Sequence, residues 1–343
     1  MKNIINKQIA IVGGGPGGLT LARLLQQDGA DVKVYERDEH AGVRVQGATL
    51  DLHEESGLKA LKAAGLMDAF RANYRPGADK LRIAGKDGAI LLDEQVKGAG
   101  EILRPEIDRG PLRKILLASL LPGTVIWDSH FISLTKTGQR WQLNFQNGST
   151  ATADIVIAAD GANSKIRPLV TPITPFYSGV TMVEGAVYDS AVTVPLLHQL
   201  LDGGKLFVMG DEKTLVLSSK GDGSLVFYTG GKTADNWYRS IDFTDKKQVL
   251  AWFQQEYAGW NESLQALFET PSGFIPRPQY CVPPDQYWET QPDLTLLGDA
   301  AHQMPPYAGE GVNMAMQDAL ELSECLISDA YPDVQHALAA YEK

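Results

Sequence analysis

A glycine-rich turn near the start of the chain carries the first recognisable chemistry. The turn, Gly13-Gly14-Gly15-Pro16-Gly17-Gly18, fits the pattern G-x-G-x-x-G, follows an apolar run at 9–12 and opens a helical pattern at 16–27. The first glycine permits a tight turn, the second lets the backbone approach a pyrophosphate, and the third lets helix and strand pack closely. The helix N-terminus adds free N–H groups and a positive dipole end. The candidate pyrophosphate-binding residues are Gly13, Gly15 and Gly18.

A carboxylate follows the turn where a ribose would lie. Residues 31–36 read as a second strand that ends in Glu36, so residues 9–36 form a strand–helix–strand unit. A carboxylate at this place can accept hydrogen bonds from both hydroxyl groups of a ribose. The unit predicts a dinucleotide site, and by itself it does not distinguish FAD from NAD.

A second string lies near the other end of the chain. Residues 294–297 read as a strand, followed by Gly298-Asp299 and by the sequence Pro305-Pro306-Tyr307-Ala308-Gly309-Glu310-Gly311-Val312-Asn313. A carboxylate at the end of a strand can accept hydrogen bonds from a polyol such as ribitol. Gly309 and Gly311 permit close approach of the backbone to a flat ring, and a helix starting near Val312 directs its positive end at that ring.

A third string, residues 155–167, is a strand followed by Asp160-Gly161. Such a pair is a common turn and says little alone. Its order and spacing relative to the other two strings indicate one shared site. His302, next to the second string, is expected to pack or to cap a helix rather than to catalyse.

The bulk composition limits the class of protein. The chain has 343 residues, a net charge of −11 and two cysteines, Cys281 and Cys325. We expect about two domains, reduced thiols, a cytoplasmic location, no signal peptide and no membrane span. The acidity argues against nucleic acid as a partner, and no spacing of residues suggests a metal site.

The elements that must position these strings alternate between two patterns. Residues 58–70 and 112–121 read as helices, and residues 127–153 read as antiparallel strands with a turn at Asn147-Gly148. Residues 181–231 read as short strands separated by glycine-rich turns, followed by helices at 246–257 and 262–268 and a proline-rich crossing segment at 275–284. The whole predicts an α/β fold whose first domain is interrupted by a mostly antiparallel sheet.

The three strings together resemble those of the single-component FAD-dependent monooxygenases of the para-hydroxybenzoate hydroxylase type. The resemblance is closest to the tetracycline-inactivating members, through residues 35–38, 47–53, 125–128 and 298–313. It implies a Rossmann-like FAD-binding domain at 1–75, 98–173 and 287–343. A substrate-binding domain is expected at 76–97 and 174–286. The family's further bridging helix is expected to be missing or truncated, because the sequence ends at Lys343.

The resemblance also implies which residues contact FAD. Besides the residues already named, it places arginines and acidic residues near the phosphates and ribitol of FAD. It also places the loop at 305–313 beside the flavin ring. The implied FAD-binding residues are Gly13, Gly15, Pro16, Gly18, Glu36, Arg37, Arg44, Asp51, Arg109, Arg113, Asp160, Gly161, Gly298, Asp299, Pro305, Gly309, Gly311, Val312 and Asn313.

The activity implied by the resemblance needs no catalytic side chain. NADPH docks transiently and reduces FAD, O2 is captured as a flavin hydroperoxide, and one oxygen atom passes to a phenol- or enol-like carbon. The flavin carries the chemistry while the protein orients the substrate and excludes water. The expected partners are an aromatic or polycyclic small molecule and O2, the protein is expected to be a monomer, and the choice between NADH and NADPH stays open.

The predicted substrate residues lie in the inserted sheet. Glu184, Lys205 and Val226 align with a glutamine, an arginine and a histidine that contact substrate in the tetracycline-inactivating enzymes, and this difference puts tetracycline itself in question. Further candidates for the pocket lining are Met182, Phe207, Met209, Phe227, Tyr228, Pro305, Ala308 and Gly309. Two alternatives stay open: an FAD oxidase or reductase of the same fold, and a non-catalytic flavin- or ligand-binding protein.

Overall fold

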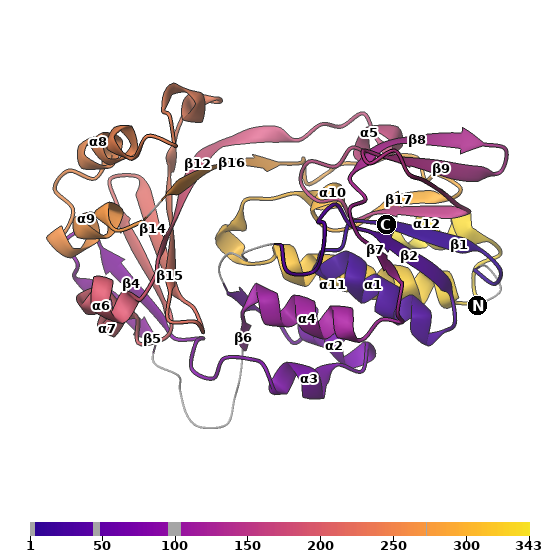
Figure 1. Cartoon of the computed structure of the whole chain (residues 1–343), viewed down its shortest axis with the longest axis horizontal. Coiled ribbons are helices and arrows are strands. Elements are labelled where there is room, and N and C mark those ends of the chain that lie inside the picture. Colours follow the sequence, from indigo (N-terminus) through magenta and orange to yellow (C-terminus); the bar gives the residue numbers. More distant parts are fainter. Residues whose placement is uncertain (1–3, 44–48, 95–103, 272) are drawn as a thin grey trace.

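The computed structural model describes residues 4–43, 49–94, 104–271 and 273–343 (Figure 1). One half of the molecule is built on a five-stranded sheet of order β17-β11-β1-β2-β7, and every neighbouring pair in it is parallel. Residues 9–12, 155–158 and 294–296 are fully buried, as expected for strands covered on both faces, whereas the strand at 31–35 exposes Asp31 and Lys33. The strands are β1 (Gln8–Val12), β2 (Asp31–Tyr35), β7 (Val125–Ile126), β11 (Ile155–Ala158) and β17 (Leu294–Leu296).

Helices pack against this sheet and against one another. Helix α1 (Pro16–Gln27) lies directly on α11 (Gly311–Ile327), where a Cβ on Gly17 would stand 2.8 Å from the carbonyl oxygen of Ala315. Glycine is therefore required at this crossing, and it joins the first and second sequence strings in space. The surrounding helices are α2 (Gly57–Ala63), α3 (Met67–Arg71), α4 (Arg109–Ala118) and α12 (Val334–Tyr341).

The other half of the molecule is a seven-stranded sheet of order β16-β12-β15-β14-β13-β4-β5. Its neighbours are antiparallel except for β13 and β4. The predicted α/β fold with a mostly antiparallel second sheet is confirmed. The strands are β4 (Leu81–Gly85), β5 (Ile90–Glu94), β12 (Phe176–Val187), β13 (Lys205–Gly210), β14 (Lys213–Ser219), β15 (Leu225–Lys232) and β16 (Phe274–Cys281).

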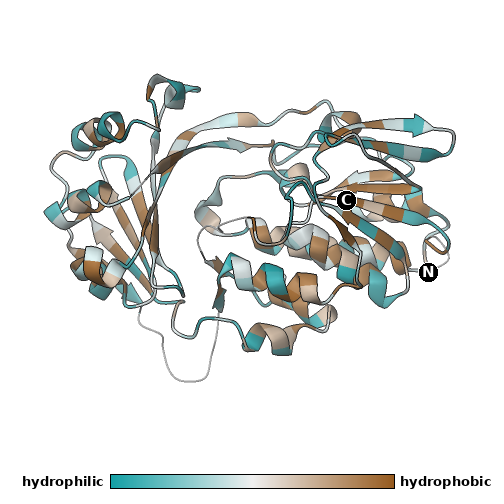
Figure 2. Ribbon diagram, in the orientation of Figure 1, coloured by the Kyte–Doolittle hydropathy of each residue, from teal (hydrophilic) through white to brown (hydrophobic). Residues whose placement is uncertain are grey.

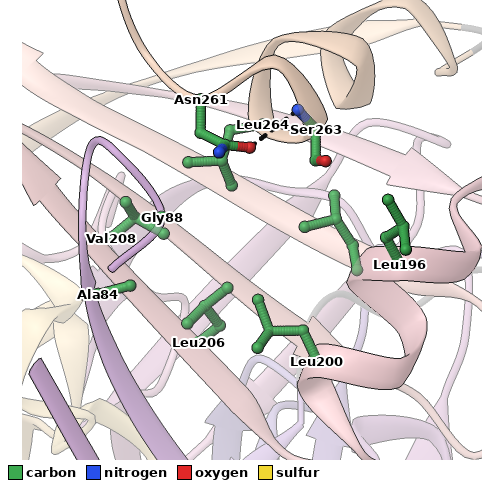
Figure 3. Close-up of a pocket in the computed structure, with 10 residues that line it drawn as sticks. Ala84, Gly88, Leu196, Leu200, Leu206, Val208, Asn261, Ser263 and Leu264 are labelled. Atoms are coloured by element: carbon green, nitrogen blue, oxygen red, sulfur yellow. Dashed lines mark hydrogen bonds between the residues drawn. The ribbon is translucent and has the colours of Figure 1, made fainter. Parts of the chain in front are cut away.

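Helices cover one face of the seven-stranded sheet. The rings of Phe253 in α8 (Lys246–Glu256) and Phe268 in α9 (Glu262–Glu269) stack at 4.1 Å, and Phe227 of β15 packs edge-on against Phe268 at 5.7 Å. A small apolar cavity of about 110 Å³ lies on this face, between β4, β13, α7 (Pro195–Leu201) and α9 (Figure 3). The opposite face is left to meet the first half of the molecule.

Two smaller sheets complete the strands. The antiparallel sheet β8 (Phe131–Thr137), β9 (Arg140–Phe145) and β10 (Thr150–Ala153) confirms the predicted turn at Asn147-Gly148, since β9 and β10 pair across it. In Figure 2 the strands of the parallel sheet are largely brown, whereas β8 is largely teal. The pair β3 (Leu50–Asp51) and β6 (Glu106–Ile107) lies where the two halves join.

Three predicted elements differ from the structure. The helix predicted at 58–70 is two helices, α2 and α3, because Gly65 between them has a φ of 71°. The β-rich stretch 181–231 contains the helices α6 (Ser190–Thr193) and α7. The proline-rich segment is strand β16, which tolerates prolines because it lies at the sheet edge.

Across the described residues, no helix has both the length and the apolar character needed to cross a membrane. The same residues contain no group of three or more histidine, cysteine or acidic side chains arranged to hold a metal ion. Cys281 and Cys325 are free thiols.

Candidate active site

The predicted cofactor residues meet at one edge of the parallel sheet. The glycine turn follows β1, Glu36 follows β2, Asp160 follows β11, and Gly298 with Asp299 follows β17. These four strands are neighbours in the sheet and all run in the same direction. Their carboxyl ends form the crevice in which open α/β sheets bind ligands.

The glycine turn is shaped as the pattern predicts. Gly13 has a φ of 114°, and a Cβ on it would stand 2.1 Å from the carbonyl oxygen of Ala159. A Cβ on Gly18 would stand 2.2 Å from the oxygen of Gly13, so this glycine brings helix and strand together. By contrast, a Cβ on Gly15 would meet no heavy atom within 4 Å. Gly15 therefore faces open space at the N-terminus of α1, a helix with no side-chain cap.

Glu36 is buried and holds the glycine turn by its own hydrogen bonds. Its Oε2 accepts from the backbone N of Gly14 at 2.7 Å, and its Oε1 accepts from the N of Asp38 at 3.1 Å. Arg113 donates to Asp38 at 3.1 Å and to the Ala41 carbonyl oxygen at 3.2 Å. Arg113 thus ties the segment after β2 to α4. Arg37 is exposed, and Arg44 lies outside the described residues.

Asp160 keeps one carboxylate oxygen without a partner. Its Oδ2 accepts from the N of Lys165 at 2.9 Å, while its buried Oδ1 has no hydrogen bond among the described residues. Burial raises the pKa of this carboxyl group, against the lowering effect of hydrogen bonds from Ser164 and Lys165. Gly161 follows it with a φ of 80°. The pair forms a polar edge next to the glycine turn.

The Gly298-Asp299 turn is fixed by Asp318 of α11. The Oδ2 of Asp318 accepts from the N of Gly298 at 2.7 Å and contacts Nε2 of His302 at 2.5 Å. Burial alone would lower the pKa of His302, but the bond and the charge of Asp318 raise it overall. Burial raises the pKa of Asp299, against the lowering charges of His302 and Arg109. His302 therefore has Asp318 as a partner within the protein.

Hydrogen bonds of Asn313 connect the start of α11 to strand β3 and to the residues after it. Asn313 is fully buried: its Oδ1 accepts from the N of His53 at 3.0 Å, and its Nδ2 donates to the Asp51 carbonyl oxygen at 2.9 Å. A Cβ on Gly309 would stand 3.0 Å from Oδ1 of Asp51, and one on Gly311 would stand 3.7 Å from Oδ1 of Asp299. Asp51 and Asp299 therefore flank the backbone at 309–311. The two hydrogen bonds of Asn313 fix the end of this loop relative to Asp51 and His53.

The uncovered face of the seven-stranded sheet carries most predicted substrate residues. Strand pairing places Glu184 beside Tyr228 and Tyr228 beside Val216, and side chains of paired residues share a face. The same pleat gives this face Met182, Lys205, Phe207, Met209 and Val226. Met182 and Val226 are buried, whereas Glu184, Phe207 and Tyr228 are partly exposed. Phe227 points to the other face, into the core formed with α8 and α9.

This face meets the loop before α11. The hydroxyl of Tyr307 stands 3.5 Å from Oγ1 of Thr214, and a Cβ on Gly230 would stand 2.2 Å from the same hydroxyl. Tyr307 lies in the short 3-10 helix η2 (Pro306–Ala308), with Pro305 before it. The loop before α11 therefore contacts the open face of the sheet, and Ala308 is exposed within this loop.

Arg109 interacts electrostatically with Tyr228 and Glu184 of the sheet and with Asp299. Its side chain is open to solvent, yet the surrounding protein lowers its pKa, opposed by Tyr228, Asp299 and Glu184. Within the described part of the chain, neither Arg109 nor Asp299 forms an ion pair with the protein. The apolar cavity of Figure 3 lies on the far face of the sheet and takes no part in this site.

Lys205 has a protein partner in the structure. Its Nζ lies 2.5 Å from Oε1 of Glu106 and 3.8 Å from Oδ1 of Asp51. Glu106 is buried, and burial raises the pKa of its carboxyl group against the lowering effect of Lys205. The pair links β6 to β13, so Lys205 connects the two halves of the molecule.

Several residues of the site carried no signal in the sequence. Asp318 supports the 298 turn from 20 residues away. Arg277, on a strand far along the chain, donates from Nε to Oε2 of Glu184 at 2.9 Å and forms an ion pair with the same oxygen at 2.8 Å. Arg167 is buried and donates to the carbonyl oxygens of Ala300 and Ala301 at 2.9 and 2.7 Å. Such partners depend on the fold, and only their charge and proximity to a motif could have drawn attention to them.

A nucleotide crevice at the ends of β17, β11, β1 and β2, facing a second sheet, defines an FAD-type oxidoreductase. A model of the FAD-binding domain family matches residues 6–250 and 288–342. The chain belongs to this family. It is 31% identical to the monooxygenase asqM of Emericella nidulans, with 92% of this chain and 83% of that protein covered. It is 26% identical to the 6-hydroxynicotinate 3-monooxygenase of Pseudomonas fluorescens, with 98% and 86% covered.

Solved structures agree with this fold. A proposed FAD-containing monooxygenase from Photorhabdus luminescens superimposes with a TM-score of 0.82 at 25% identity, covering 98% of this chain and 93% of the other. The tetracycline destructase Tet(51) superimposes with a TM-score of 0.72 at 19% identity, covering 98% and 85%. The chain is therefore an FAD-dependent monooxygenase with the para-hydroxybenzoate hydroxylase type of fold, as the sequence predicted.

The residues present fit FAD. Gly15 leaves room in front of an uncapped helix N-terminus, and the unpaired oxygen of Asp160 lies beside the same turn. Asp299 and Arg109 form no ion pair with the protein in the described ranges, so both can take ligand contacts. The N-terminus of α1 suits a pyrophosphate, the carboxylate of Asp299 suits a polyol, and the backbone at 309–311 suits a flat ring.

Proposed function

We propose that this enzyme uses NAD(P)H and O2 to hydroxylate a phenol- or enol-bearing ring, bound between its FAD and the seven-stranded sheet. The observation that carries the proposal is the contact of Tyr307 with Thr214, which brings the loop beside the flavin site against the open sheet face. A ring placed there lies between the 309–311 backbone and Tyr228. The proposal assigns the chemistry to one place where a flavin and a substrate can touch.

The proposed roles of the chain's own residues follow from this geometry. Gly13, Gly15 and Pro16 admit the pyrophosphate to the N-terminus of α1, and Asp299 accepts from the ribitol. Bound FAD supplies the redox chemistry with O2. Arg109 balances negative charge at the site. The buried residues of the site act indirectly, because they hold the backbone that contacts the cofactor. Further cofactor contacts, direct or indirect, are proposed for Gly18, Glu36, Arg37, Arg44, Asp51, Arg113, Asp160, Gly161, Gly298, Pro305, Gly309, Gly311, Val312 and Asn313.

The proposed substrate contacts come from the sheet and the loop. Glu184 presents a carboxylate held by Arg277, which can accept a hydrogen bond from a hydroxyl or amino group on a ring. Phe207 offers an apolar wall across the same face. The same face of the sheet also contributes Met182, Lys205 and Val226 to the proposed substrate site. The loop contributes Pro305, Ala308 and Gly309 from the opposite side.

Two lines of similarity bear on the substrate. Curated relatives at 26% and 29% identity act on 6-hydroxynicotinate and 3-amino-4-hydroxybenzoate, which are both hydroxylated single rings. The tetracycline destructases Tet(51) and Tet(55) share the fold at 19% and 22% identity. We propose a hydroxylated ring as the general class and tetracycline inactivation, a form of antibiotic resistance, as one specific case to test.

The remaining assignments are proposals of the same kind. Residues 1–75, 98–173 and 287–343 would form the FAD-binding domain, and residues 76–97 and 174–286 the substrate-binding domain. The protein would act as a cytoplasmic monomer and would take NADPH only transiently. An oxidase or reductase reaction on the same fold is the alternative that the assay below distinguishes.

The test is oxidation of NADPH, and separately of NADH, by the FAD-loaded protein under air. Tetracycline, 6-hydroxynicotinate and 3-amino-4-hydroxybenzoate are added one at a time, and the mixtures are analysed by mass spectrometry. Monooxygenation predicts a faster NAD(P)H oxidation and a product that has gained one oxygen atom. Such a product is about sixteen mass units heavier, or about 28 lighter where hydroxylation at the carboxyl-bearing C3 of 6-hydroxynicotinate releases CO2. Stimulated oxidation without an oxygenated product would indicate an oxidase or reductase and would overturn the proposal.

A further inference from the structure

Strand pairing arranges the open face of the seven-stranded sheet in rows of side chains. One row runs from β12 through β15, β14, β13 and β4 to β5, because each of its residues is paired with the next. Paired residues share a face, and neighbouring strands lie about 4.8 Å apart. We call this the central row, and its members are Glu184, Tyr228, Val216, Phe207, Ile83 and Leu92.

The central row is polar at its β12 end and apolar over the rest of its length. At the polar end, Glu184 accepts a hydrogen bond from Nε of Arg277 at 2.9 Å, and Tyr228 is paired with Glu184. The remaining members span β14, β13, β4 and β5, a distance of about 14 Å for three strand spacings. They are Val216, Phe207 and Ile83, which are partly exposed, and Leu92, which is 42% exposed.

The apolar part of the central row lies outside the hydrophobic core. The residues that alternate with it on the same strands point to the helix-covered face and form the core there, namely Leu215, Leu217, Leu206, Val208 and Ala84. An antiparallel sheet with one face on the core usually presents polar side chains on its other face. Core packing therefore does not explain the apolar residues of the central row, and an exposed apolar run of this kind marks a binding surface.

Contacts with the FAD-binding half of the molecule lie on both sides of the central row. On β14, the hydroxyl of Tyr307 stands 3.5 Å from Oγ1 of Thr214, two residues before Val216, and Oγ1 of Thr49 stands 3.1 Å from Oγ of Ser218, two residues after it. Residues two apart on a strand are about 7 Å apart. A ring at Tyr228 is therefore next to the apolar part of the central row.

We propose that the substrate carries an apolar arm, an alkyl chain or a second ring, which lies along the apolar part of the central row. This inference deepens the proposed function and rests on it. The hydroxylated ring lies at Tyr228 with a polar group towards Glu184, and the arm points towards the sheet edge at β5. Rings without an arm bind less tightly, because they leave this apolar surface in water.

The probes are resorcinol, 4-ethylresorcinol, 4-hexylresorcinol and 4-benzylresorcinol, which share one hydroxylated ring and differ only in the arm. Binding to the FAD-loaded protein is measured by the change in the visible absorption of the flavin, so a ligand in the far-face cavity of Figure 3 does not contribute. Each methylene group that is fully buried tightens binding by up to about fourfold. The hexyl or the benzyl compound should therefore bind at least about tenfold more tightly than the ethyl compound, and the tighter of the two shows which kind of arm fits.

Variants locate the arm on the sheet. Ile83→Gln and Leu92→Gln each place a polar amide in the apolar part of the central row and should reduce this advantage to about threefold or less. Leu92 is exposed on an edge strand, so its variant should fold even if Ile83→Gln does not. The matched control is Ile275→Gln. Ile275 is paired with Glu184 and 49% exposed, so it lies on the same face beyond the polar end, and its variant should keep the wild-type advantage.

Three results would overturn the proposal. The first is that neither the hexyl nor the benzyl compound binds wild type more tightly than 4-ethylresorcinol. The second is an advantage that both Ile83→Gln and Leu92→Gln retain, and the third is an equal loss in Ile275→Gln. Failure of the proposed function looks different: ring compounds would give no oxygenated product, while the binding advantage and its dependence on the central row would still follow the pattern above.

Discussion

Replacing Gly15 by alanine should separate cofactor binding from folding. Gly15 has φ −77° and ψ 177°, which alanine adopts easily, and its new methyl group would meet no protein atom within 4 Å. Alanine at a helix N-cap costs about 0.5–1 kcal/mol relative to glycine. The smaller entropy of the unfolded chain returns about 0.4–1 kcal/mol. The free energy of unfolding without FAD should therefore change by less than about 1 kcal/mol.

The same methyl group should harm FAD binding. It fills the open space in front of the N-terminus of α1, where the pyrophosphate must approach the backbone. Forcing a methyl group into a close-packed contact costs about 1–3 kcal/mol. That range corresponds to a dissociation constant roughly 5- to 150-fold larger.

Gly13→Ala serves as the matched comparison. Its backbone has a φ of 114°, and the new Cβ would stand 2.1 Å from a backbone oxygen, so the chain itself must move. Backbone strain of about 1–3 kcal/mol and overpacking of about 1–3 kcal/mol together should cost about 2–6 kcal/mol of stability. Gly13→Ala should thus destabilise the FAD-free protein, and Gly15→Ala should not.

The assay combines urea unfolding of the FAD-free proteins with FAD titration by fluorescence. A Gly15→Ala variant that binds FAD as tightly as wild type would refute the assignment of the pyrophosphate to this turn. Equal destabilisation by the two alanines would instead show that the turn does not have the geometry described here.

Three further predictions concern other parts of the site. Asp299→Ala should lose its yellow colour on desalting, and a variant that stays fully yellow would remove Asp299 from the cofactor site. Lys205→Ala leaves the buried Glu106 unpaired and should cost about 3–5 kcal/mol in urea unfolding, largely recovered when Glu106→Gln is added; an unrecovered loss would contradict the pairing. The raised pKa of His302 means that its ion pair with Asp318 stabilises the fold below the ordinary histidine pKa and that this contribution is lost as pH rises through the folded pKa. Asp318→Asn should therefore flatten the alkaline side of the unfolding free energy against pH, and an unchanged slope would show that this pair is not responsible.

The cofactor strings could be predicted because their geometry is local. Gly13 and Gly18 are needed by the turn itself, within a few residues of β1 and α1. Asp160 and Asp299 could be placed beside them because parallel strands end at a common edge of the sheet. Nothing beyond the order of strands and helices is needed for this step.

The inserted sheet was predicted less completely because its elements depend on distant contacts. The α7 helix lies among strands, and its burial against β13 and α9 is not visible in the local pattern. The prolines of 275–284 argue against a strand until the segment is known to lie at an edge. Phe207 and Phe227 were both candidates for the pocket lining, but Phe227 points into the core formed with α8 and α9, because it follows the opposite phase of the pleat.

The charges available to a ligand depend on pairs that form across the fold. Lys205 is held by Glu106, and Arg113 is held by Asp38, although each arginine or lysine looks free in the sequence. Once such pairs are formed, the attraction that either partner exerts on a ligand largely cancels. Arg109 has no such ion pair in the described ranges, although Asp299 and Glu184 interact with it electrostatically, so more of its charge is available to a ligand. The polarity of this active site is therefore set by which cations the fold leaves unneutralised, and this is a property of tertiary contacts.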